Sequence, residues 1–353
     1  MSTGDTARVA LVLSGGGARG AYQVGALRAV AERFGPQGIG IVSGSSIGAV
    51  NGAVMAEGIE AGNLEGALAA LEQEWLSLSG LLRFNWRALL RASWRLVVHG
   101  PSPLVLQAVD SLLDGEVVVR RLCRFLPPRR RMGDFRRVDL VVTATDLNEG
   151  VTHAFDRTQP DVRVLDAVLA SSAFPGAFAS RRIGLRWYVD GGIFDNAPLD
   201  QAIRRGATDI VLVGTAPRCG EGAPGYESGP FADVYAVMRR LWPLMLDRLL
   251  YGDLRKALLV SEIVSIIEES PDPDSPVMRR LKRAIGYESA GRRKRALSIV
   301  PICPPEGVDA PGTFGFGESR AIASLMRQGY DDAHRILAQQ RPAGPAGTAV
   351  RAT

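Results

Sequence analysis

The chain has 353 residues, of which 46% are hydrophobic and 22% charged, and its formal net charge is +5 at pH 7. This is an ordinary globular composition, and its mild basic excess suits anionic partners such as a membrane surface. Three widely spaced cysteines do not suggest a disulfide framework or metal-ligand spacing, so we expect a reducing compartment, the cytoplasm. No stretch resembles a signal peptide or approaches the roughly 20 apolar residues of a membrane span, so we expect a protein that at most lies on a membrane.

The first sixty residues alternate between strand and helix patterns. The apolar run at 8–13 ends at Ser-Gly and predicts a buried strand, and 18–33 has helical spacing. A second strand is predicted at 38–46, followed by a helix over 47–58 that ends at Gly58. This β-α-β-α order favours the α/β class, with a parallel sheet covered by helices.

The rest of the chain continues this pattern around a helical insertion. Helical spacing dominates 62–126, and the Gly-, Pro- and charge-rich segments 217–230 and 270–295 are predicted to be flexible surface insertions. We therefore expect a single domain over 5–340 and a disordered tail over 341–353. Later strands are predicted at 137–147, 187–192, 208–215 and 296–301, and later helices at 164–174 and 317–337.

Three glycines directly follow the first predicted strand. Gly15, Gly17 and Gly20 satisfy the dinucleotide fingerprint G-x-G-x-x-G between a strand and a helix. That fingerprint also expects an acid at the end of the second strand to hold a ribose, but this strand ends in Val-Ser-Gly-Ser-Ser and Glu32 comes too early. The loop is therefore predicted to offer backbone N–H groups to a phosphate or to an oxyanion formed during a reaction.

The second predicted strand ends in G-x-S-x-G, formed by Gly44, Ser46 and Gly48. A tight turn between a strand and a helix pushes the serine hydroxyl out of the chain, and the flanking glycines make room for it. The positive end of the following helix favours negative charge at this position. The pattern predicts a nucleophilic serine; the alternative is a Gly/Ser-rich turn with Ser46 as a helix N-cap.

A serine nucleophile needs a base, and Asp190 is the candidate that stands out. It ends a short predicted strand and is followed by Gly191 and Gly192. A carboxylate is ordinarily a weak base, but partial burial beside the serine can raise its basicity. The alternative is an aspartate in an ordinary Asp-Gly turn. Asp146 competes for the base role, because it ends a strong predicted strand and could line the same crevice, but a place in a turn is favoured for it. Asp195 and Asn196 are expected to cap or stiffen the Asp190 turn.

The three motifs all follow predicted strand ends, and in an open α/β sheet the carboxyl ends of the strands line one crevice. In this order, G-G-G-x-R-G, G-x-S-x-G and D-G-G make the chain resemble the patatin-like phospholipase family, its bacterial members in particular. The resemblance extends over roughly residues 8–337. The stretches at 143–150, 170–178 and 195–199 are also similar to the family.

The resemblance implies a three-layer α/β/α fold with a central, mostly parallel sheet, and a serine lipid acyl hydrolase with a Ser–Asp dyad. By position, Ser46 is then the nucleophile and Asp190 the general base. The implied activity is that of a carboxylic ester hydrolase of the phospholipase A or lysophospholipase type, with no cofactor and no metal. The oxyanion hole falls on the glycine loop, with the N–H groups of Gly16 and Gly17 as expected donors: Gly15, Gly16, Gly17 and Arg19.

Three other functions stay open on the sequence. A nucleotide-binding or regulatory protein uses the glycine loop as a phosphate cradle, and an inactive scaffold keeps the fold alone. A Ser-His-Asp esterase needs a histidine, and the order Ser46, Asp190, His334 matches that of the α/β-hydrolases. His334 lies inside a helical pattern, however, and no motif surrounds His99 or His153.

Two basic segments are candidates for contact with an anionic membrane surface. Over 81–98, arginines recur every four residues beside an apolar stripe with tryptophans, a pattern that also fits a helix packed on the core. Over 278–295, eight Lys or Arg accompany a single Glu, which also fits a solvated loop. The expected partner is a phospholipid or other lipid ester and not a nucleic acid, because no recognition motif for nucleic acid occurs.

Overall fold

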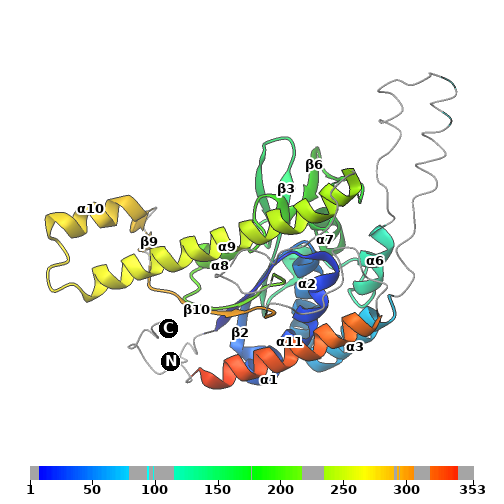
Figure 1. Cartoon of the computed structure of the whole chain (residues 1–353), viewed down its shortest axis with the longest axis horizontal. Coiled ribbons are helices and arrows are strands. Elements are labelled where there is room, and N and C mark those ends of the chain that lie inside the picture. Colours follow the sequence, from blue (N-terminus) through cyan, green and yellow to red (C-terminus); the bar gives the residue numbers. More distant parts are fainter. Residues whose placement is uncertain are drawn as a thin grey trace.

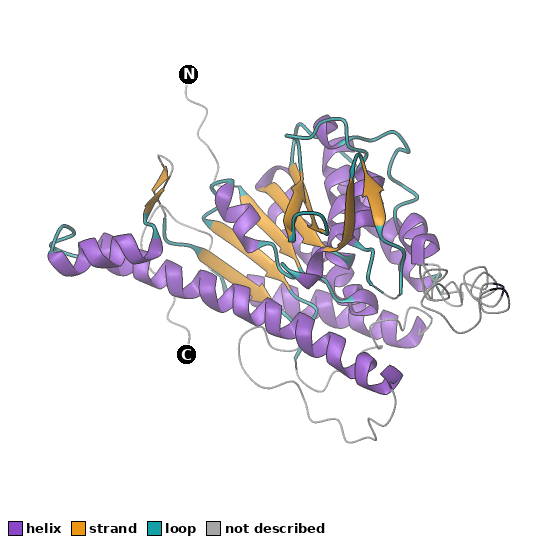
Figure 2. Cartoon of the chain, turned by 90° about the horizontal axis from the view of Figure 1, so that it is seen from above, coloured by secondary structure: helices purple, strands orange, loops and turns teal. Residues whose placement is uncertain are grey.

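The computed structural model describes residues 8–78, 94, 98, 115–175, 177–216, 234–289, 292–293, 295–305 and 319–340. These residues form three layers, with an eight-stranded sheet between two layers of helices (Figure 1). Figure 2 shows the sheet from above, with long helices running beside it. The three-layer α/β/α class is therefore confirmed.

The sheet is mixed, with a parallel centre and antiparallel strands around β3. Its order is β10-β7-β1-β2-β3-β6-β5, and β4 pairs with β3 outside this path. The mutually parallel strands are β1 (Val9–Leu13), β2 (Ile39–Ser45), β3 (Asp139–Asp146), β7 (Asp209–Val213) and β10 (Ser298–Ile302). Strands β4 (Val151–Phe155) and β6 (Arg186–Asp190) pair antiparallel with β3, and β5 (Arg181–Ile183) pairs antiparallel with β6.

Both faces of the sheet are buried, because alternate residues of a strand face opposite helix layers. In β1, Leu11 and Leu13 join the core on one face, whereas Ala10 and Val12 join the core on the other. The first face is covered by α1 (Ala21–Gly38), α2 (Ile47–Ala61), α3 (Leu64–Leu76), α6 (Gly115–Leu122), α7 (Val164–Ser171) and α11 (Ser319–Gln339). The second face is covered by α8 (Leu199–Arg204) and α9 (Val234–Glu269). Short 3₁₀ helices are η1 (Gly17–Gly20), η2 (Met132–Asp134) and η3 (Gly191–Ile193).

Strand β6 runs against the parallel strands, which the sequence pattern does not indicate. A strand has two edges, and Val142 and Thr143 of β3 pair with both β2 and β4, so these neighbours lie on opposite edges. Residues 144–146 pair with both β4 and β6, so β6 lies on the same edge as β2. Strands β2 and β6 therefore approach each other end to end along one edge of β3.

Helix α9 has 36 residues, and its second half extends beyond the sheet to form an arm with α10 (Pro276–Ile285) (Figure 1). The arm has a small core of its own, built from Val264, Ile267 and Tyr287. The short strands β8 (Glu288–Ser289) and β9 (Arg292–Arg293) follow α10. The flexible insertion expected over 270–295 is thus helical in part, and Ser275 caps α10 by accepting a hydrogen bond from the N–H of Met278.

Helix α2 continues past its predicted end at Gly58. A Cβ atom at Gly58 would lie 2.7 Å from the Cβ of Ala67, so this glycine lets α2 and α3 pack closely instead of ending the helix. The helix ends at Gly62, whose φ of 72° lies in the left-handed region that terminates helices.

Some predicted elements fall outside the described residues. These are the insertion at 217–230, the tail at 341–353, His99 and, apart from Trp94 and Val98, the helix at 81–98. Among the helices that the structure does describe, none combines the length and the apolar character needed to cross a bilayer.

Candidate active site

Ser46 lies at a sharp turn between the end of β2 and the start of α2. Its backbone has φ 54° and ψ −123°, and among the described residues it is the one non-glycine residue with positive φ. The turn has no room for flanking side chains, because a Cβ atom at Gly44 would lie 2.4 Å from the carbonyl oxygen of Gly48. A strained turn of this kind presents the serine hydroxyl at the edge of the sheet.

The Ser46 hydroxyl donates a hydrogen bond of 2.6 Å to Oδ2 of Asp190. Ser46 occupies the N-cap position of α2, but its side chain makes no capping hydrogen bond to the helix. The sheet register explains the contact: Ser45 pairs with Thr143, and Asp190 pairs with the next residue, Ala144. Two strand ends that meet on one edge of β3 thus bring the hydroxyl and the carboxylate together.

Two serines at the end of α7 hold the backbone of this turn. The N–H of Ser46 donates to Oγ of Ser171 at 2.8 Å, and the Ser172 hydroxyl donates to the Ser46 carbonyl oxygen at 3.4 Å. Both serines lie in the stretch at 170–178 that the sequence likens to the family. Their hydrogen bonds stabilise a backbone conformation that an L-residue rarely adopts.

Asp190 is buried, with 2% of its surface exposed, and both of its carboxylate oxygens accept hydrogen bonds. Its Oδ1 accepts from the N–H of Gly192 at 2.8 Å. Burial raises the pKa of Asp190 to about 7, against the smaller lowering effect of the hydrogen bonds from Ser46 and Gly192. A carboxyl group with a pKa near neutrality is suited to accept and return a proton, as a general base must.

The glycine loop lies next to Ser46, since a Cβ atom at Gly15 would lie 3.1 Å from the Cβ of Ser46. The N–H of Gly15 is already used, because it donates to Oδ1 of Asn196 at 3.0 Å. Gly16 and Gly17 lead into η1, and within the described part of the chain their N–H groups donate to no protein acceptor. This loop therefore offers backbone donors to a negative charge.

The glycines of the loop are required by its neighbours. A Cβ atom at Gly16 would lie 2.1 Å from Oγ1 of Thr215, which follows β7. A Cβ atom at Gly20 would lie 2.5 Å from Cγ1 of Ile47, so the third glycine of the fingerprint lets η1 pack on α2. Close packing thus explains why position 20 of the G-x-G-x-x-G pattern is glycine, and no bound nucleotide is needed to explain it.

Helix α9 contributes two residues that the sequence patterns miss. The Nδ2 group of Asn196 donates to the carbonyl oxygen of Leu246 at 2.8 Å, while its Oδ1 accepts from Gly15. The next residue of α9, Asp247, forms an ion pair of 3.2 Å with Arg19, and both side chains are largely buried. Arg19 therefore turns its guanidinium group toward α9, and the glycine loop is tied to this helix at two points.

Asp146, the competing acid, has the turn role that the sequence favours. It accepts hydrogen bonds from the N–H groups of Asn148 and Glu149, and it pairs with Arg186 at 2.8 Å. Burial acts to raise its pKa, but these partners outweigh burial and hold the pKa below its ordinary value. Asp146 is thus committed to the β3–β4 turn.

The described histidines lie in other settings. His334 is exposed on α11 and stacks on the ring of Tyr330, with 5.9 Å between the ring centroids. His153 lies on β4 and packs against Phe155 at 4.6 Å. In the part of the chain that the structure covers, no group of three or more His, Cys, Asp or Glu side chains is arranged to hold a metal ion.

Comparison with known sequences points in the same direction. The profile of the patatin-like phospholipase family matches residues 11–203. An uncharacterized NTE family protein of Mycobacterium tuberculosis is 29% identical over 234 residues, which cover 63% of this chain and 52% of the relative. The patatin-like phospholipase domain-containing protein 7 of Mus musculus is 56% identical over 57 residues, or 16% of this chain and 4% of that protein. The chain thus spans about half the length of the NTE family relative.

Solved structures give weaker matches. VipD from Legionella pneumophila has a TM-score of 0.43 at 17% identity, covering 94% of this chain and 67% of VipD. The type III effector protein ExoU, from Pseudomonas aeruginosa, has a TM-score of 0.27 at 16% identity, covering 78% and 62%. Scores this low do not establish a shared fold, so the fold is assigned from the family match and from the layers described above.

Proposed function

Since this chain belongs to the patatin-like phospholipase family, we propose that it is a lipid acyl hydrolase in which Ser46 is the nucleophile and Asp190 the general base. The observation that carries the proposal is the 2.6 Å hydrogen bond from the Ser46 hydroxyl to a buried carboxyl group whose pKa lies near 7. The substrate is the ester of a phospholipid or lysophospholipid, and the reaction uses no cofactor.

Acylation begins when Asp190 accepts the hydroxyl proton of Ser46 while Oγ attacks the ester carbonyl carbon. The carbonyl oxygen becomes an oxyanion, which the N–H groups of Gly16 and Gly17 stabilise together with the positive end of α2. When the tetrahedral intermediate collapses, the alcohol leaves with the proton held by Asp190. The acyl group stays on Ser46 as an ester.

Deacylation repeats these steps with water in place of the alcohol. Asp190 accepts a proton from the water, and the resulting hydroxide attacks the acyl carbonyl carbon. The same loop stabilises the second oxyanion. The fatty acid then leaves, and the proton returns from Asp190 to the Oγ of Ser46, which restores the starting state.

A fluorophosphonate probe tests the proposal, because it forms a covalent bond with activated serines. The wild type should be labelled at Ser46, and Ser46→Ala should not be labelled. The matched control is Ser45→Ala, which removes a neighbouring buried hydroxyl without a hydrogen-bond partner among the described residues and should keep the labelling. Thermal stabilisation by NAD or ATP together with no labelling would favour the nucleotide-binding alternative instead.

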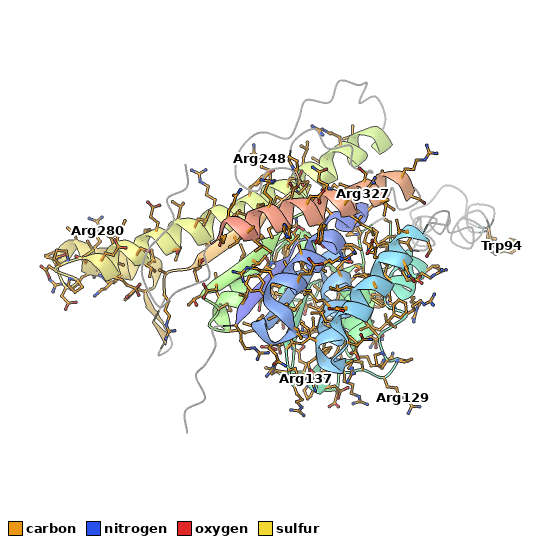
Figure 3. All side chains as sticks on the ribbon, turned by 90° about the horizontal axis from the view of Figure 1, so that it is seen from below. Trp94, Arg129, Arg137, Arg248, Arg280 and Arg327 are labelled. Atoms are coloured by element: carbon orange, nitrogen blue, oxygen red, sulfur yellow. The ribbon has the colours of Figure 1, made fainter. Side chains whose placement is uncertain are left out.

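A further part of the proposal is that α10 contacts an anionic membrane surface. Arg279, Arg280 and Arg283 are exposed, while Met278 and Leu281 pack on the core of the arm. Figure 3 shows Arg280 near the outer end of this arm. A basic helix of this kind is attracted to anionic headgroups.

Vesicles containing phosphatidylserine test this contact. Binding should weaken as salt is added and when the three exposed arginines are changed to Gln, because each basic residue near the surface contributes about 1 kcal/mol. Binding that is unchanged in the triple variant would remove α10 from the proposal.

A further inference from the structure

Two hairpins carry exposed apolar side chains beyond the end of β3. Leu147, in the turn between β3 and β4, is 54% exposed. Leu185, in the turn between β5 and β6, is 86% exposed, and Trp187 of β6 is 44% exposed. Large apolar side chains that lie together on the surface mark contact sites for proteins or membranes. We call Leu147, Leu185 and Trp187 the hairpin rim.

The hairpin rim lies at the edge of the sheet that holds the catalytic pair. Strand β6 enters from beyond the end of β3 and runs inward to Asp190, which pairs with Ala144. Trp187 and Leu185 precede Asp190 by three and five residues, so they lie about 10 and 17 Å further out along the hairpin. The hairpin rim therefore lies beyond the strand ends at which Asp190 and Ser46 meet.

The two hairpins are joined to each other and stand on a packed base. The N–H of Leu147 donates to the carbonyl oxygen of Trp187 at 2.9 Å, and the N–H of Trp187 donates to Oδ1 of Asn148 at 2.7 Å. Tyr188 faces the opposite side of the sheet from Trp187 and is buried against the ring of Phe155, at 5.0 Å between centroids. Because the backbone beneath them is ordered, the exposed apolar side chains of the hairpin rim lose little conformational entropy when they are buried against a partner.

The charges around the hairpin rim suit a surface that carries phosphate groups. Arg182 is exposed, pairs with Trp187 across the β5–β6 hairpin, and donates from its Nε to the carbonyl oxygen of Gly184 at 3.1 Å, so a cation lies at the tip of this hairpin. The acids of the neighbouring turn, Asp146 and Glu149, both form ion pairs with Arg186, at 2.8 and 2.6 Å. Both acids of the turn are thus paired with an arginine, and Arg182 places an exposed positive charge on the neighbouring hairpin.

We propose that the hairpin rim inserts into the surface of a lipid aggregate and holds the catalytic edge of the sheet against it. This inference rests on the proposed lipid substrate and specifies how the site meets it. Tryptophan favours the boundary between headgroups and acyl chains, and leucine favours the acyl chains. A lipid ester then passes from the aggregate to Ser46 without its acyl chain crossing bulk water.

Vesicles of pure phosphatidylcholine test the proposal, because they carry no net charge for the basic α10 to bind. Binding is measured by cosedimentation of Ser46→Ala protein, so that the vesicles are not hydrolysed. Added to this background, Leu185→Gln/Trp187→Gln should weaken binding roughly ten- to hundredfold. Trp187→Phe, which keeps an aromatic side chain, should stay within about threefold of the parent. The matched control is Leu259→Gln, which changes a side chain of α9 that is 50% exposed and should leave binding unchanged.

Hydrolysis gives a second readout that a folding defect would not reproduce. With Ser46 intact, the double variant should hydrolyse a soluble monomeric ester such as p-nitrophenyl butyrate at the wild-type rate. Its activity on phosphatidylcholine vesicles should fall by the same factor as binding. An equal loss of both activities would overturn the proposal.

Two further outcomes would also overturn it. One is equal vesicle binding by the double variant and its parent. The other is that the parent protein does not bind vesicles but forms a dimer, whereas the double variant is monomeric. The hairpin rim is then a protein interface. Since binding is measured without the Ser46 hydroxyl, a failure of the proposed hydrolysis leaves this test of the hairpin rim valid.

Discussion

Ser46 and Asp190 are in contact because the strands that lead to them end head-on along one edge of β3. Ser45 closes β2 opposite Thr143, and Asp190 closes β6 opposite the next residue, Ala144. The result is a hydrogen bond of 2.6 Å between the Ser46 hydroxyl and the carboxylate, with no third residue between them. The register of the sheet thus leaves no position for a histidine between the proposed nucleophile and the proposed base.

Ester hydrolysis should depend on one ionisation near neutral pH. Burial raises the pKa of Asp190 to about 7, and a general base acts only in its deprotonated form. We expect kcat/KM for a soluble ester to fall about tenfold per pH unit below about pH 7 and to level off above it. The measurement is a pH profile between about pH 5 and about pH 9.

The control for this profile is Asp195, a neighbour of similar acidity. Burial and then the nearby Asp253 carboxylate raise the pKa of Asp195 to about 7 as well. Asp195→Asn should keep the wild-type profile. A profile that loses its acid limb in this variant would assign the ionisation to Asp195 and contradict the role of Asp190.

Asp190→Asn should be more stable than the wild type at neutral and alkaline pH. Because the pKa of Asp190 rises from 3.8 to about 7 on folding, the folded protein keeps a proton that the unfolded chain releases between these values. The stabilising effect of that proton is complete at acid pH and is lost as the pH rises through about 7. Asparagine has no charge to bury, so the variant should gain up to about 4 kcal/mol over the wild type.

Urea unfolding at several pH values measures this difference. The gap between the variant and the wild type should widen between about pH 4 and about pH 7 and stay constant above that range. A gap that does not change with pH would mean that Asp190 ionises in the folded protein as it does in the unfolded chain.

Asn196→Ala should slow the reaction more than it weakens substrate binding. The side chain links the Gly15 amide to the Leu246 carbonyl oxygen, so its loss removes one tie between α9 and the loop that carries the proposed oxyanion donors, while the Gly15 N–H keeps its bond to the Asn196 carbonyl oxygen. We expect kcat for a soluble ester to fall about 10- to 100-fold, with KM changed less than about threefold. The control is Asn63→Ala, which removes the N-cap of α3 at a cost of about 1 kcal/mol and should leave kcat unchanged. If both variants lost kcat equally, Asn196 would affect the reaction only through the stability of the fold.

Gly329→Ala should destabilise the fold, because α11 contacts α1 closely at this position. A Cβ atom there would lie 2.0 Å from the carbonyl oxygen of Tyr22, so the two backbones must separate, at a cost of about 3 kcal/mol. Gly252→Ala in α9 is the matched control, since an added Cβ atom meets nothing within 4 Å. It should stabilise the protein by about 0.5–1 kcal/mol. Thermal unfolding of both variants measures the contrast, and a Gly329→Ala protein as stable as the wild type would contradict the close contact.

The turn that carries Ser46 could be predicted from the sequence because its requirements are local. A side chain at Gly44 or Gly48 would clash with backbone atoms that lie within a few residues or on the adjacent strand. The motif alone therefore indicates the geometry of the turn. The first two strands and helices are likewise encoded by short apolar runs and by helical spacing. These are the parts of the site for which sequence and structure agree.

The direction of β6 could not be predicted in the same way. Side chains alternate along a strand whichever way it runs, so a short run such as 186–190 does not indicate whether its neighbour is parallel. The sequence interpretation places Asp190 at the carboxyl end of a strand like the others. In the structure, Asp190 reaches Ser46 because an antiparallel strand enters from outside and stops opposite Ala144.

The contribution of α9 depends on contacts that are distant in the sequence. Pro243 and Gly252 interrupt the pattern and obscure a helix that the spacing of Leu246, Leu250 and Leu254 indicates. Even with the helix predicted, nothing local shows that its residues bind the glycine loop some 200 positions earlier. That contact appears only when the layers are assembled.

The rate of fluorophosphonate labelling of Ser46 tests most directly whether Asp190 activates this serine without a histidine. Asp190→Asn should slow labelling about 10²- to 10⁴-fold while the protein stays folded, and His334→Ala should label at the wild-type rate. A wild-type rate in Asp190→Asn, or loss of labelling in a folded His334→Ala protein, would contradict the dyad.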